Sequence, residues 1–435
     1  MTANVVKLGQ IATIDISNVD KKSKVGEAEV RLCNFVDVYH NWAITDNISQ
    51  GFMVATANEN QVVRFSVKKG MIAITKDSET RNDIGIPTYI ADDFTDVVLG
   101  YHCALIKPDE TILEGKYLNV VLHTEYAKRY FEANASGSGQ RYTLTNEIIA
   151  GFPVPLPTIE EQRKIGNLFS TIDKKIENNN AICVDLEGMA KLLYDYWFVQ
   201  FDFPDENGKP YKSSGGKMVW NEKLKREIPE GWEVIRLGDY ITANRGISYN
   251  STTLEGNGVP MINLASFNVD STYKASGLKT YSGAYGEDQV LRPYDLVMCN
   301  TQQTAIDPAK DIIGKALLVP DIFDGDIVSS HHVTTIHVAD DAFKYYLHAE
   351  SKTTWFHKYV AGFASGTNIL GLDFNGVLNY KMPIPPKEIM SKFANISHSS
   401  EARKNEVIRE NADLVGLRDF LLPMLMNGQV KVKGA

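Results

Sequence analysis

A single stretch of about 40 residues, 158–198, constrains the fold more than any other part of the sequence. It contains no proline, and its apolar residues return every three or four positions, the spacing of one face of a long helix. At about 1.5 Å per residue, such a helix would extend roughly 60 Å. Thr158 and Glu161 stand at the spacing of a capping box at its start. The apolar positions are Ile165, Phe169, Ile172, Ile176, Cys183, Leu186, Ala190, Leu193 and Trp197.

A second stretch of the same character covers residues 387–427. We expect Pro423 to bend or end this helix near Leu422, because proline removes a backbone donor, and Gly428 fits a C-terminal cap. An apolar helix face needs a mate, so the simplest arrangement is an antiparallel pair. Asn179 interrupts the first face: it either fixes register or partner inside the pair, or faces water. The apolar positions of the second stretch are Phe393, Ile396, Val407, Leu414, Leu417, Leu421 and Met424.

The two helices belong to a repeat that covers the whole chain. A shift of about 229 positions brings similar residues into register, and each predicted helix follows a proline-rich segment. We infer a tandem duplication, in which a globular part and a helix occur twice. The matches are Leu8-Gly9 with Leu237-Gly238, Val30 with Val259, Asn34 with Asn263, Tyr117-Leu118 with Tyr346-Leu347, Tyr130 with Tyr359, Ala135–Gly137 with Ala364–Gly366 and, one residue further, His102 with His332 and Pro153 with Pro383.

Composition narrows the class of protein. A hydrophobic content of 43% supports real cores, and 435 residues accommodate two domains and long helices. The four cysteines are scattered without a CxxC pair, so neither disulfides nor zinc are indicated. We find no signal peptide and no membrane span, and expect a cytoplasmic protein. The net charge of −9 means that any nucleic-acid contact must come from local patches or a basic partner.

Each globular part shows strand-like and helical segments in the same order. Residues 71–74 and 102–106 read as buried strands of the first part, followed by a helix at 117–132 and a Gly/Ser-rich loop at 135–142. In the second part the strands are 297–299 and 332–336, the helix is 344–360 and the loop is 364–368. Residues 201–232 are rich in Gly, Pro, Ser and charge and read as a linker, with a tight turn or small hairpin at DENGK.

Several segments resemble the specificity subunit of type I restriction-modification enzymes, over nearly the whole chain. They are PLPTIEEQRKI, the WF that ends the first helix, FDFPDENGKPYKSSGG, EIPEGWEVIRLGDY and FLLPMLMNG. The run from Trp197 to Tyr240 is the strongest of these signals. The resemblance implies an α+β (mixed α/β) fold: two target-recognition domains separated by a pair of long antiparallel coiled-coil helices, with an internal pseudo-two-fold repeat.

The resemblance also implies function and partners. Each domain would read one half of a bipartite site in double-stranded DNA, and two methyltransferase subunits would dock on the assembly, with restriction or translocase subunits as further partners. The chain would be non-catalytic and without a cofactor; S-adenosylmethionine, ATP and Mg would belong to the partner subunits. The expected parts are a first recognition domain at 1–157, a helix at 158–200, a linker at 201–231, a second recognition domain at 232–386, a helix at 387–428 and a tail at 429–435.

DNA contacts are expected on loops at one edge of each recognition domain. Arginine and lysine suit guanine or phosphate, glutamine and asparagine suit adenine, and glycine lets backbones approach closely. The alternative for each residue is an ordinary solvated loop position. The candidates are Lys76, Arg81, Gln140, Arg141 and Tyr142 in the first domain, and Arg245, Tyr249, Gln302, Gln303, Ser365, Thr367 and Asn368 in the second.

Catalytic and metal-binding patterns are weak. The chain has no phosphate-binding loop, no Gly-rich nucleotide fingerprint and no Asn-Pro-Pro-aromatic tetrad. Asp109, Glu114 and Lys116 imitate a metal-dependent nuclease signature at very short spacing. His331 and His332 could be metal ligands, but neighbours in a strand point to opposite faces, so a structural role shared with His102 is favoured.

The aromatic cluster at the end of the first helix has two readings, an anchor to a domain or a docking patch, and the anchor is favoured. Its members are Tyr194, Tyr196, Trp197, Phe198 and Phe201. Rival functions remain for the chain as a whole. They are a specificity subunit of a type II-like system, a regulatory or anti-restriction derivative, a nuclease that uses the Asp109 group, and a coiled-coil adaptor that binds only protein.

Overall fold

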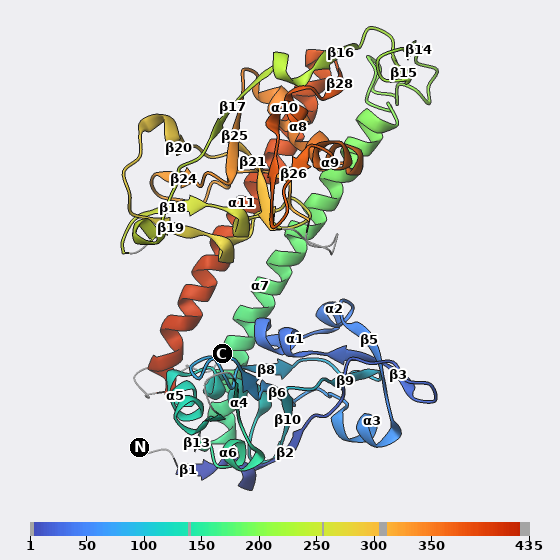
Figure 1. Cartoon of the computed structure of the whole chain (residues 1–435). Helices are drawn as coiled ribbons and strands as arrows, with labels where there is room; N and C mark the ends of the chain where they lie inside the picture. The colour runs from blue at the N-terminus through green and yellow to red at the C-terminus, as the bar shows by residue number, and fades with distance from the viewer. Residues whose placement is uncertain (1–3, 138–140, 255, 304–310, 427–435) are drawn as a thin grey trace. The chain divides into compact units, whose positions relative to one another are not determined.

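The computed structural model describes residues 4–137, 141–254, 256–303 and 311–426. The chain forms two compact units, one of residues 1–178 with 411–435 and one of residues 179–410. Each of the two long helices therefore contributes one end to each unit. The units are described separately, and Figure 1 gives the labels of their helices and strands.

The first unit is a mixed α/β domain around two sheets. Its five-stranded sheet has the order β2-β10-β6-β8-β4, and a three-stranded sheet has the order β5-β3-β9. The predicted strands are present as β6 (Ile72–Thr75) and β10 (Cys103–Pro108). The remaining strands are β2 (Ala12–Ile16), β8 (Pro87–Ile90), β4 (Ala43–Ile44), β5 (Met53–Ala57), β3 (Ala28–Cys33), β9 (Val97–Leu99) and the pair β1 (Asn4–Lys7) and β13 (Pro153–Leu156).

Short helices cover these sheets, and one expectation about them is wrong. The single helix expected at 117–132 is two helices, α4 (Gly115–Leu122) and α5 (Glu125–Asn134). The second helix starts anew because the side chain of Thr124 accepts a hydrogen bond from the backbone N–H of Ala127 and so caps its N-terminus. The other helices of the unit are α1 (Phe35–His40), α2 (Asp46–Ser49), α3 (Glu59–Phe65) and α6 (Asn146–Ala150).

The second unit repeats this plan. One four-stranded sheet has the order β17-β25-β21-β23, and another has the order β19-β18-β24-β20. The predicted strands are present as β21 (Leu296–Cys299) and β25 (Val333–Val338). The other strands are β17 (Ile241–Arg245), β23 (Ala316–Leu318), β19 (Lys279–Tyr281), β18 (Val259–Ile262), β24 (Ile327–Ser329), β20 (Val290–Leu291) and the pair β16 (Glu233–Arg236) and β28 (Lys381–Ile384).

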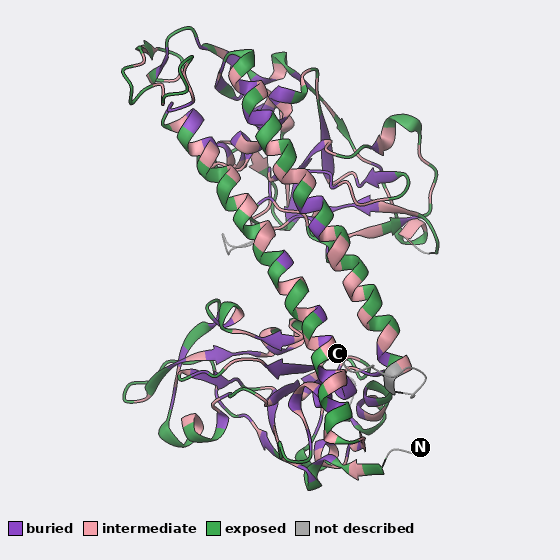
Figure 2. Ribbon diagram, turned by 180° about the vertical axis from the view of Figure 1, so that it is seen from behind, coloured by how far each residue is buried: buried purple, intermediate pink, exposed green. Residues whose placement is uncertain are grey.

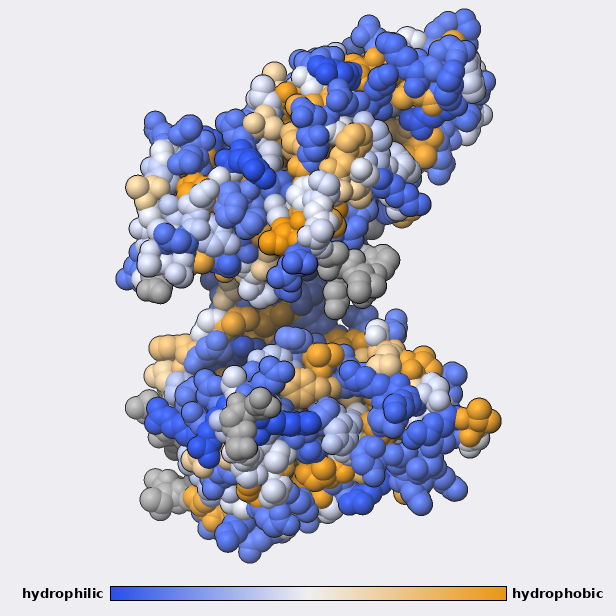
Figure 3. Space-filling view, in the orientation of Figure 1, coloured by the Kyte–Doolittle hydropathy of each residue, from blue (hydrophilic) through white to orange (hydrophobic). Residues whose placement is uncertain are grey.

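Register supports the internal repeat. Thr75 pairs with Cys103 in the first unit, and Cys299 pairs with Val333 at the same place in the second. The helix expected at 344–360 is again two, α8 (Asp341–Ser351) and α9 (Thr354–Ala361), because Thr353 caps the second. Helix α10 (Phe374–Leu378) corresponds to α6. Buried residues line the interiors of both units in Figure 2, and Figure 3 shows apolar side chains interrupting the hydrophilic surface of both.

The segment expected as a linker is folded against the second unit. It contains the antiparallel hairpin of β14 (Met218–Asn221) and β15 (Arg226–Pro229), and a bridge joins Pro204 to Pro210 around the DENGK turn. Phe201 and Phe203 are buried in the same core as Trp232. Burial of these aromatic side chains explains why a Gly- and Pro-rich stretch is ordered.

The long helices are α7 (Ile159–Tyr194) and α11 (Lys387–Met426). Thr158 and Glu161 form the expected capping box: the Glu161 carboxylate accepts from the Thr158 backbone at 3.2 Å, and Thr158 Oγ1 accepts from Glu161 N at 3.3 Å. Helix α11 runs on through Pro423, so of the two expected effects of this proline, a bend or an end, the end near Leu422 is wrong. Gly428 lies outside the described residues.

The two helices pair antiparallel within each unit. In the first unit, Phe169 near the start of α7 packs with Leu422 near the end of α11. In the second unit, Asn179 Nδ2 donates to Glu410 Oε2 at 2.9 Å, and Glu187 further along α7 pairs with Lys404 earlier in α11. Asn179 is fully buried, so the reading in which it faces water is excluded.

The predicted apolar faces are only partly buried. Ile396 and Leu417 are 45% and 46% exposed, contrary to expectation, since a helix of 3.6 residues per turn drifts relative to a straight partner. The aromatic end of α7 forms a π-helical turn (Asp195–Val199). Tyr194 and Trp197 there are buried in the core of the second unit, which supports the anchoring role. No helix in the described residues is long and apolar enough to cross a membrane.

Candidate nucleic-acid interface

A small sheet stands at one edge of each domain, where the predicted contact residues lie. In the first domain, β11 (Ser136–Gly137), β12 (Tyr142–Thr143) and β7 (Asp77–Ser78) form it in the order β11-β12-β7. In the second domain, β26 (Ala364–Ser365), β27 (Ile369–Leu372) and β22 (Thr301–Gln303) form its counterpart. The described parts of the expected Gly/Ser loops therefore belong to paired antiparallel strands.

Glycine is required at the same point of both hairpins. Gly137 has a φ of 145° and Gly366 a φ of 142°, in the region that side chains rarely adopt. A Cβ atom at Gly137 would lie 2.1 Å from the carbonyl oxygen of Arg141, and one at Gly366 would lie 1.9 Å from that of Ile369. This shared constraint explains why the repeated ASG sequence is kept in both halves of the chain.

A carboxylate organises the edge of the first domain. Asp77 Oδ2 lies 2.8 Å from Lys76 Nζ, 2.6 Å from His102 Nδ1 and 3.2 Å from Arg141 Nη2. Burial by itself would raise the pKa of Asp77, but hydrogen bonds from Lys76, Thr143 and His102 lower it to about 2. Asp77 is therefore an internal anion that holds two of the predicted DNA-contact residues. The sequence argument missed it, although it directly follows Lys76 after a buried strand.

The backbone at this edge is also constrained. His102 has a φ of 74°, a left-handed conformation that is costly outside glycine. Its carbonyl oxygen accepts a hydrogen bond from Lys76 N at 2.9 Å. Arg81 donates from Nη2 to the carbonyl oxygen of Ala135 at 3.0 Å and lies over the ring of Tyr142, 5.8 Å from its centroid. Lys76, Arg81, Arg141 and Tyr142 therefore belong to one edge, while Gln140 lies outside the described residues.

The corresponding edge of the second domain is built from neutral side chains. Asn300 Nδ2 donates to Thr334 Oγ1 at 2.7 Å, and Thr301 donates to Asn300 Oδ1 at 2.8 Å. Gln302 Oε1 accepts from the backbone N–H groups of Ile312 and Ile313 at 2.7 and 2.8 Å. Gln302 is only 5% exposed, so its side chain supports the edge from inside, unlike the accessible contact that was expected.

The other predicted residues of the second domain are accessible. Gln303 ends β22, Ser365 ends β26, and Thr367 and Asn368 form the hairpin tip, and all four are exposed. Arg245 is exposed at the end of β17. Tyr249 lies further along the same segment, with its ring 5.4 Å from that of His331 and 6.2 Å from that of His332.

The argument that His331 and His332 point to opposite faces is wrong. Both residues precede β25, where the strand pattern does not apply, and their ring centroids lie 3.8 Å apart. Burial, then His331, Arg245 and Lys279, lower the pKa of His332. The described residues contain no group of three or more His, Cys, Asp or Glu side chains that could hold a metal ion.

The nuclease-like residues have structural roles. Asp109 Oδ1 accepts from Thr111 N at 3.1 Å, and Glu114 caps α4 by accepting from Tyr117 N at 2.6 Å. Lys116 donates to Asn167 Oδ1 on α7 at 2.9 Å. Burial raises the pKa of Glu114. These contacts give each of the three residues a role in packing the domain.

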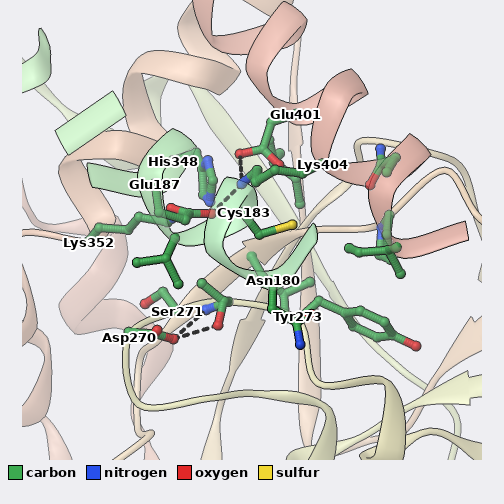
Figure 4. A pocket seen from close by; sticks show the side chains of 17 residues that line it. Asn180, Cys183, Glu187, Asp270, Ser271, Tyr273, His348, Lys352, Glu401 and Lys404 are labelled. Carbon is green, nitrogen blue, oxygen red and sulfur yellow. Dashed lines mark hydrogen bonds and ion pairs between the residues drawn. The ribbon is translucent and has the colours of Figure 1, made fainter. Parts of the chain in front are cut away.

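A cavity of about 280 Å³ lies in the second unit, where α7 and α11 meet the domain (Figure 4). Lys404 pairs there with Glu187 and with Glu401, and Lys352 pairs with Glu187 at 2.7 Å. Three buried polar atoms lining it have no hydrogen-bond partner among the described residues: Ser271 Oγ, His348 Nε2 and Asn405 Nδ2. Such a cavity suits ordered water. None of the predicted DNA-contact residues lines it.

The two domains share one design, and each presents a glycine-dependent hairpin, with different polar side chains beside it. Residues 2–187 match the family described as type I restriction modification DNA specificity domain. Together with the curated relatives described next, this match agrees with the resemblance to the specificity subunits of type I restriction-modification enzymes that the sequence shows.

Curated relatives extend this match along the chain. The chain is 24% identical over 321 residues to the type I restriction enzyme MjaIX specificity subunit of Methanocaldococcus jannaschii, which covers 73% of this chain and 70% of the relative. It is 24% identical over 422 residues to the HindI specificity subunit of Haemophilus influenzae, covering 84% of this chain and 87% of the relative.

A solved structure supports the fold. The structure of a type I restriction-modification S subunit from M. genitalium aligns over 97% of this chain and 96% of its own, with a TM-score of 0.52 and 13% identity. At that identity the likeness speaks for the fold alone. The mixed α/β class with two domains and long helices is thereby confirmed.

Proposed function

We propose that this chain recognises a bipartite DNA site, with one domain reading each half, and positions methyltransferase subunits on it. The observation that carries the proposal is the pair of equivalent hairpin edges, which share a glycine-dependent backbone but differ in side chains. Equivalent backbones favour equivalent placement on DNA, and different side chains favour different base sequences. Two methyltransferase subunits would supply S-adenosylmethionine chemistry, and associated restriction subunits would use ATP and Mg.

The predicted contact residues remain proposals for DNA binding. Lys76, Arg81, Gln140, Arg141 and Tyr142 would serve the first half-site. Arg245, Tyr249, Gln303, Ser365, Thr367 and Asn368 would serve the second. Gln302 keeps a supporting role, because its carbonyl group is already used by the backbone of Ile312 and Ile313.

The test is to express the chain with its methyltransferase partner and to map methylated adenines across a genome by long-read sequencing. The expected result is one motif made of two short sequences separated by a fixed, unread gap. A continuous motif would contradict the proposal. Divalent-metal-dependent cleavage by the isolated chain would favour a nuclease, and a partner complex without sequence preference would favour a protein-binding adaptor.

The helix pair would determine the gap. Seven residues inserted after Asn180 keep the apolar face of α7 in phase and add about 10 Å of helix. The expected outcome on a library of gap lengths is a longer preferred gap with both half-site sequences unchanged. An insertion of seven residues in the exposed DENGK turn is the matched control and should leave the gap unchanged. Full activity at the original gap after the α7 insertion would show that another element sets the spacing.

A further inference from the structure

The two domains differ at one equivalent position. His102 directly precedes the first residue of β10, and His332 directly precedes the first residue of β25. In the first domain this histidine contacts the carboxylate of Asp77 at 2.6 Å. In the second domain the residue at the place of Asp77 is Thr301, which is neutral and donates to Asn300.

The second domain gathers donors around this position. Lys279 Nζ lies 3.4 Å from the hydroxyl oxygen of Tyr249 and 5.1 Å from the centroid of its ring. The ring of Tyr249 in turn packs near both His331 and His332. Arg245 and Lys279 act electrostatically on His332, and no acidic side chain of the described residues is among the influences on its pKa. The cluster of Tyr249, Lys279, His331 and His332, here called the histidine cluster, therefore combines one cationic side chain with two imidazole groups and has no carboxylate of its own.

The imidazole groups are arranged to donate outward. Within the described residues neither ring makes a side-chain hydrogen bond, and Nδ1 of each is buried without a partner. Because Nδ1 of each ring is enclosed without a partner, Nε2 is the ring nitrogen that can act on an external group, and as an N–H it donates. Both histidines are partly exposed, and Nε2 is absent from the buried unpaired atoms, so this N–H can reach an external acceptor.

The backbone that carries the cluster is fixed. His331 N donates to the carbonyl oxygen of Ile247 at 2.8 Å, and Asn300 N donates to that of His332 at 3.0 Å. Gly246 lets the two segments approach, because a Cβ there would lie 2.3 Å from the carbonyl oxygen of Ser329. The donors are thus held in place before any ligand arrives.

We propose that the histidine cluster holds a DNA phosphate of the second half-site, and that Asp77 supplies the corresponding anion internally in the first domain. The inference rests on the proposed function, because it assumes that the second domain binds DNA. Phosphate is the acceptor that fits, since it brings both oxygen acceptors and the negative charge that the cluster lacks.

The experiment uses the complex of the full chain with its methyltransferase partner. The test variants are the double substitution His331→Phe/His332→Phe, which keeps the rings but removes their donors, and Lys279→Met. His337→Phe is the matched control, because His337 is exposed on β25 beyond the cluster. DNA affinity is measured against salt concentration on duplexes that match or mismatch the second half-site.

Each test variant should bind about tenfold more weakly on matched and mismatched DNA alike, about the loss of one charge-assisted hydrogen bond. For Lys279→Met the slope of log affinity against log salt should fall by about 1, because a charged phosphate contact is removed. A single uncharged methylphosphonate is then placed at each backbone position in turn. At one position it should weaken binding of the wild-type complex but not weaken binding of the variants any further. The control should behave as wild type.

The opposing outcomes are distinct. A loss of affinity confined to matched DNA would overturn the phosphate assignment and indicate that the cluster reads bases. Unchanged affinity in both variants would show that the histidine cluster does not contact DNA. If the double variant does not fold, Lys279→Met decides by the same criteria. A wild-type complex without sequence preference would instead overturn the proposed function.

Discussion

The two hairpin edges share a backbone and differ in how their polar groups are satisfied. In the first domain, Lys76, His102 and Arg141 converge on Asp77, so cationic side chains are neutralised within the domain. In the second, Thr301 donates to the neutral side chain of Asn300, and no carboxylate of the described residues acts on the nearby His332. A duplicated fold can therefore keep its frame while the electrostatic character of its reading edge changes.

The charges around α7 and α11 also differ between the two units, but here the second unit is the balanced one. In the second unit, Lys404 and Lys352 balance Glu187 and Glu401. In the first unit, Glu177 accepts a hydrogen bond from Thr45 at 2.5 Å, and Arg418 lies 4.8 Å from the ring centroid of Trp42. Burial, and then the charge of Glu177, raise the pKa of Asp173 there to about 7, although Arg418 opposes the shift. The contact in the second unit is therefore a balanced group of ion pairs, whereas the contact in the first unit has more acidic than basic side chains.

The largest expected effect comes from breaking the balanced group. Lys404 is 9% exposed; burial disfavours its charge, but Glu401 and Glu187 together raise its pKa above the ordinary value. Lys404→Met should destabilise the second unit by about 3 kcal/mol, because two carboxylates lose their shared cation. Hydrogen exchange of the amides of residues 179–410 measures this. Arg403→Met, in the exposed pair with Glu406, is the control and should cost under about 1 kcal/mol.

Removing the internal anion of the first domain should have the next largest effect. Asp77→Asn should destabilise that domain by about 2 kcal/mol, because Lys76, His102 and Arg141 lose their common acceptor. Since folding lowers the pKa of Asp77 from 3.8 to about 2, its contribution is full above pH 3.8 and disappears as the pH falls through 2. Denaturant unfolding at pH 7 and at pH 2 should show the difference only at pH 7. Thr301→Val, at the equivalent position of the second domain, should reduce stability by less than Asp77→Asn does. An equal loss of stability would contradict the contrast between the two edges.

Substitutions of base-reading residues in the two domains should affect different half-sites. Arg141→Ala should weaken recognition of one half-site by about 1–3 kcal/mol, and Asn368→Ala should do so at the other. Binding to duplexes mutated in one half at a time measures both effects. Equal weakening at the two half-sites by either variant would indicate a phosphate or structural role.

The smallest expected effect concerns the acid-rich helix contact. A carboxyl with a raised pKa in the folded state favours folding at low pH, and this advantage is lost as the pH rises from 3.8 through about 7. Asp173→Asn should therefore raise stability at pH 8 on the order of 1 kcal/mol and flatten its decline between pH 4 and 7. Thermal unfolding across that range measures it. Lys174→Gln at the exposed neighbouring position is the control, and an unchanged pH profile in Asp173→Asn would contradict the prediction.

The sequence by itself determined the repeat, the strands β6, β10, β21 and β25, both long helices and the capping box of Thr158 and Glu161. These follow from local periodicity and from identities that persist at one spacing, which require no knowledge of distant contacts. The positions of the ASG turns were also readable, because a left-handed backbone demands glycine wherever the chain is placed.

Tertiary structure decided the rest. Burial of Phe201 and Phe203 ordered a segment that composition assigns to a linker, and α11 continues through Pro423. Asp77 gathers its partners from positions 76, 102 and 141, and the rings of His331 and His332 lie close together because both residues stand outside the strand. Such contacts depend on which segments the fold brings together, and the charge of a binding edge is a sum over those neighbours that no local pattern contains.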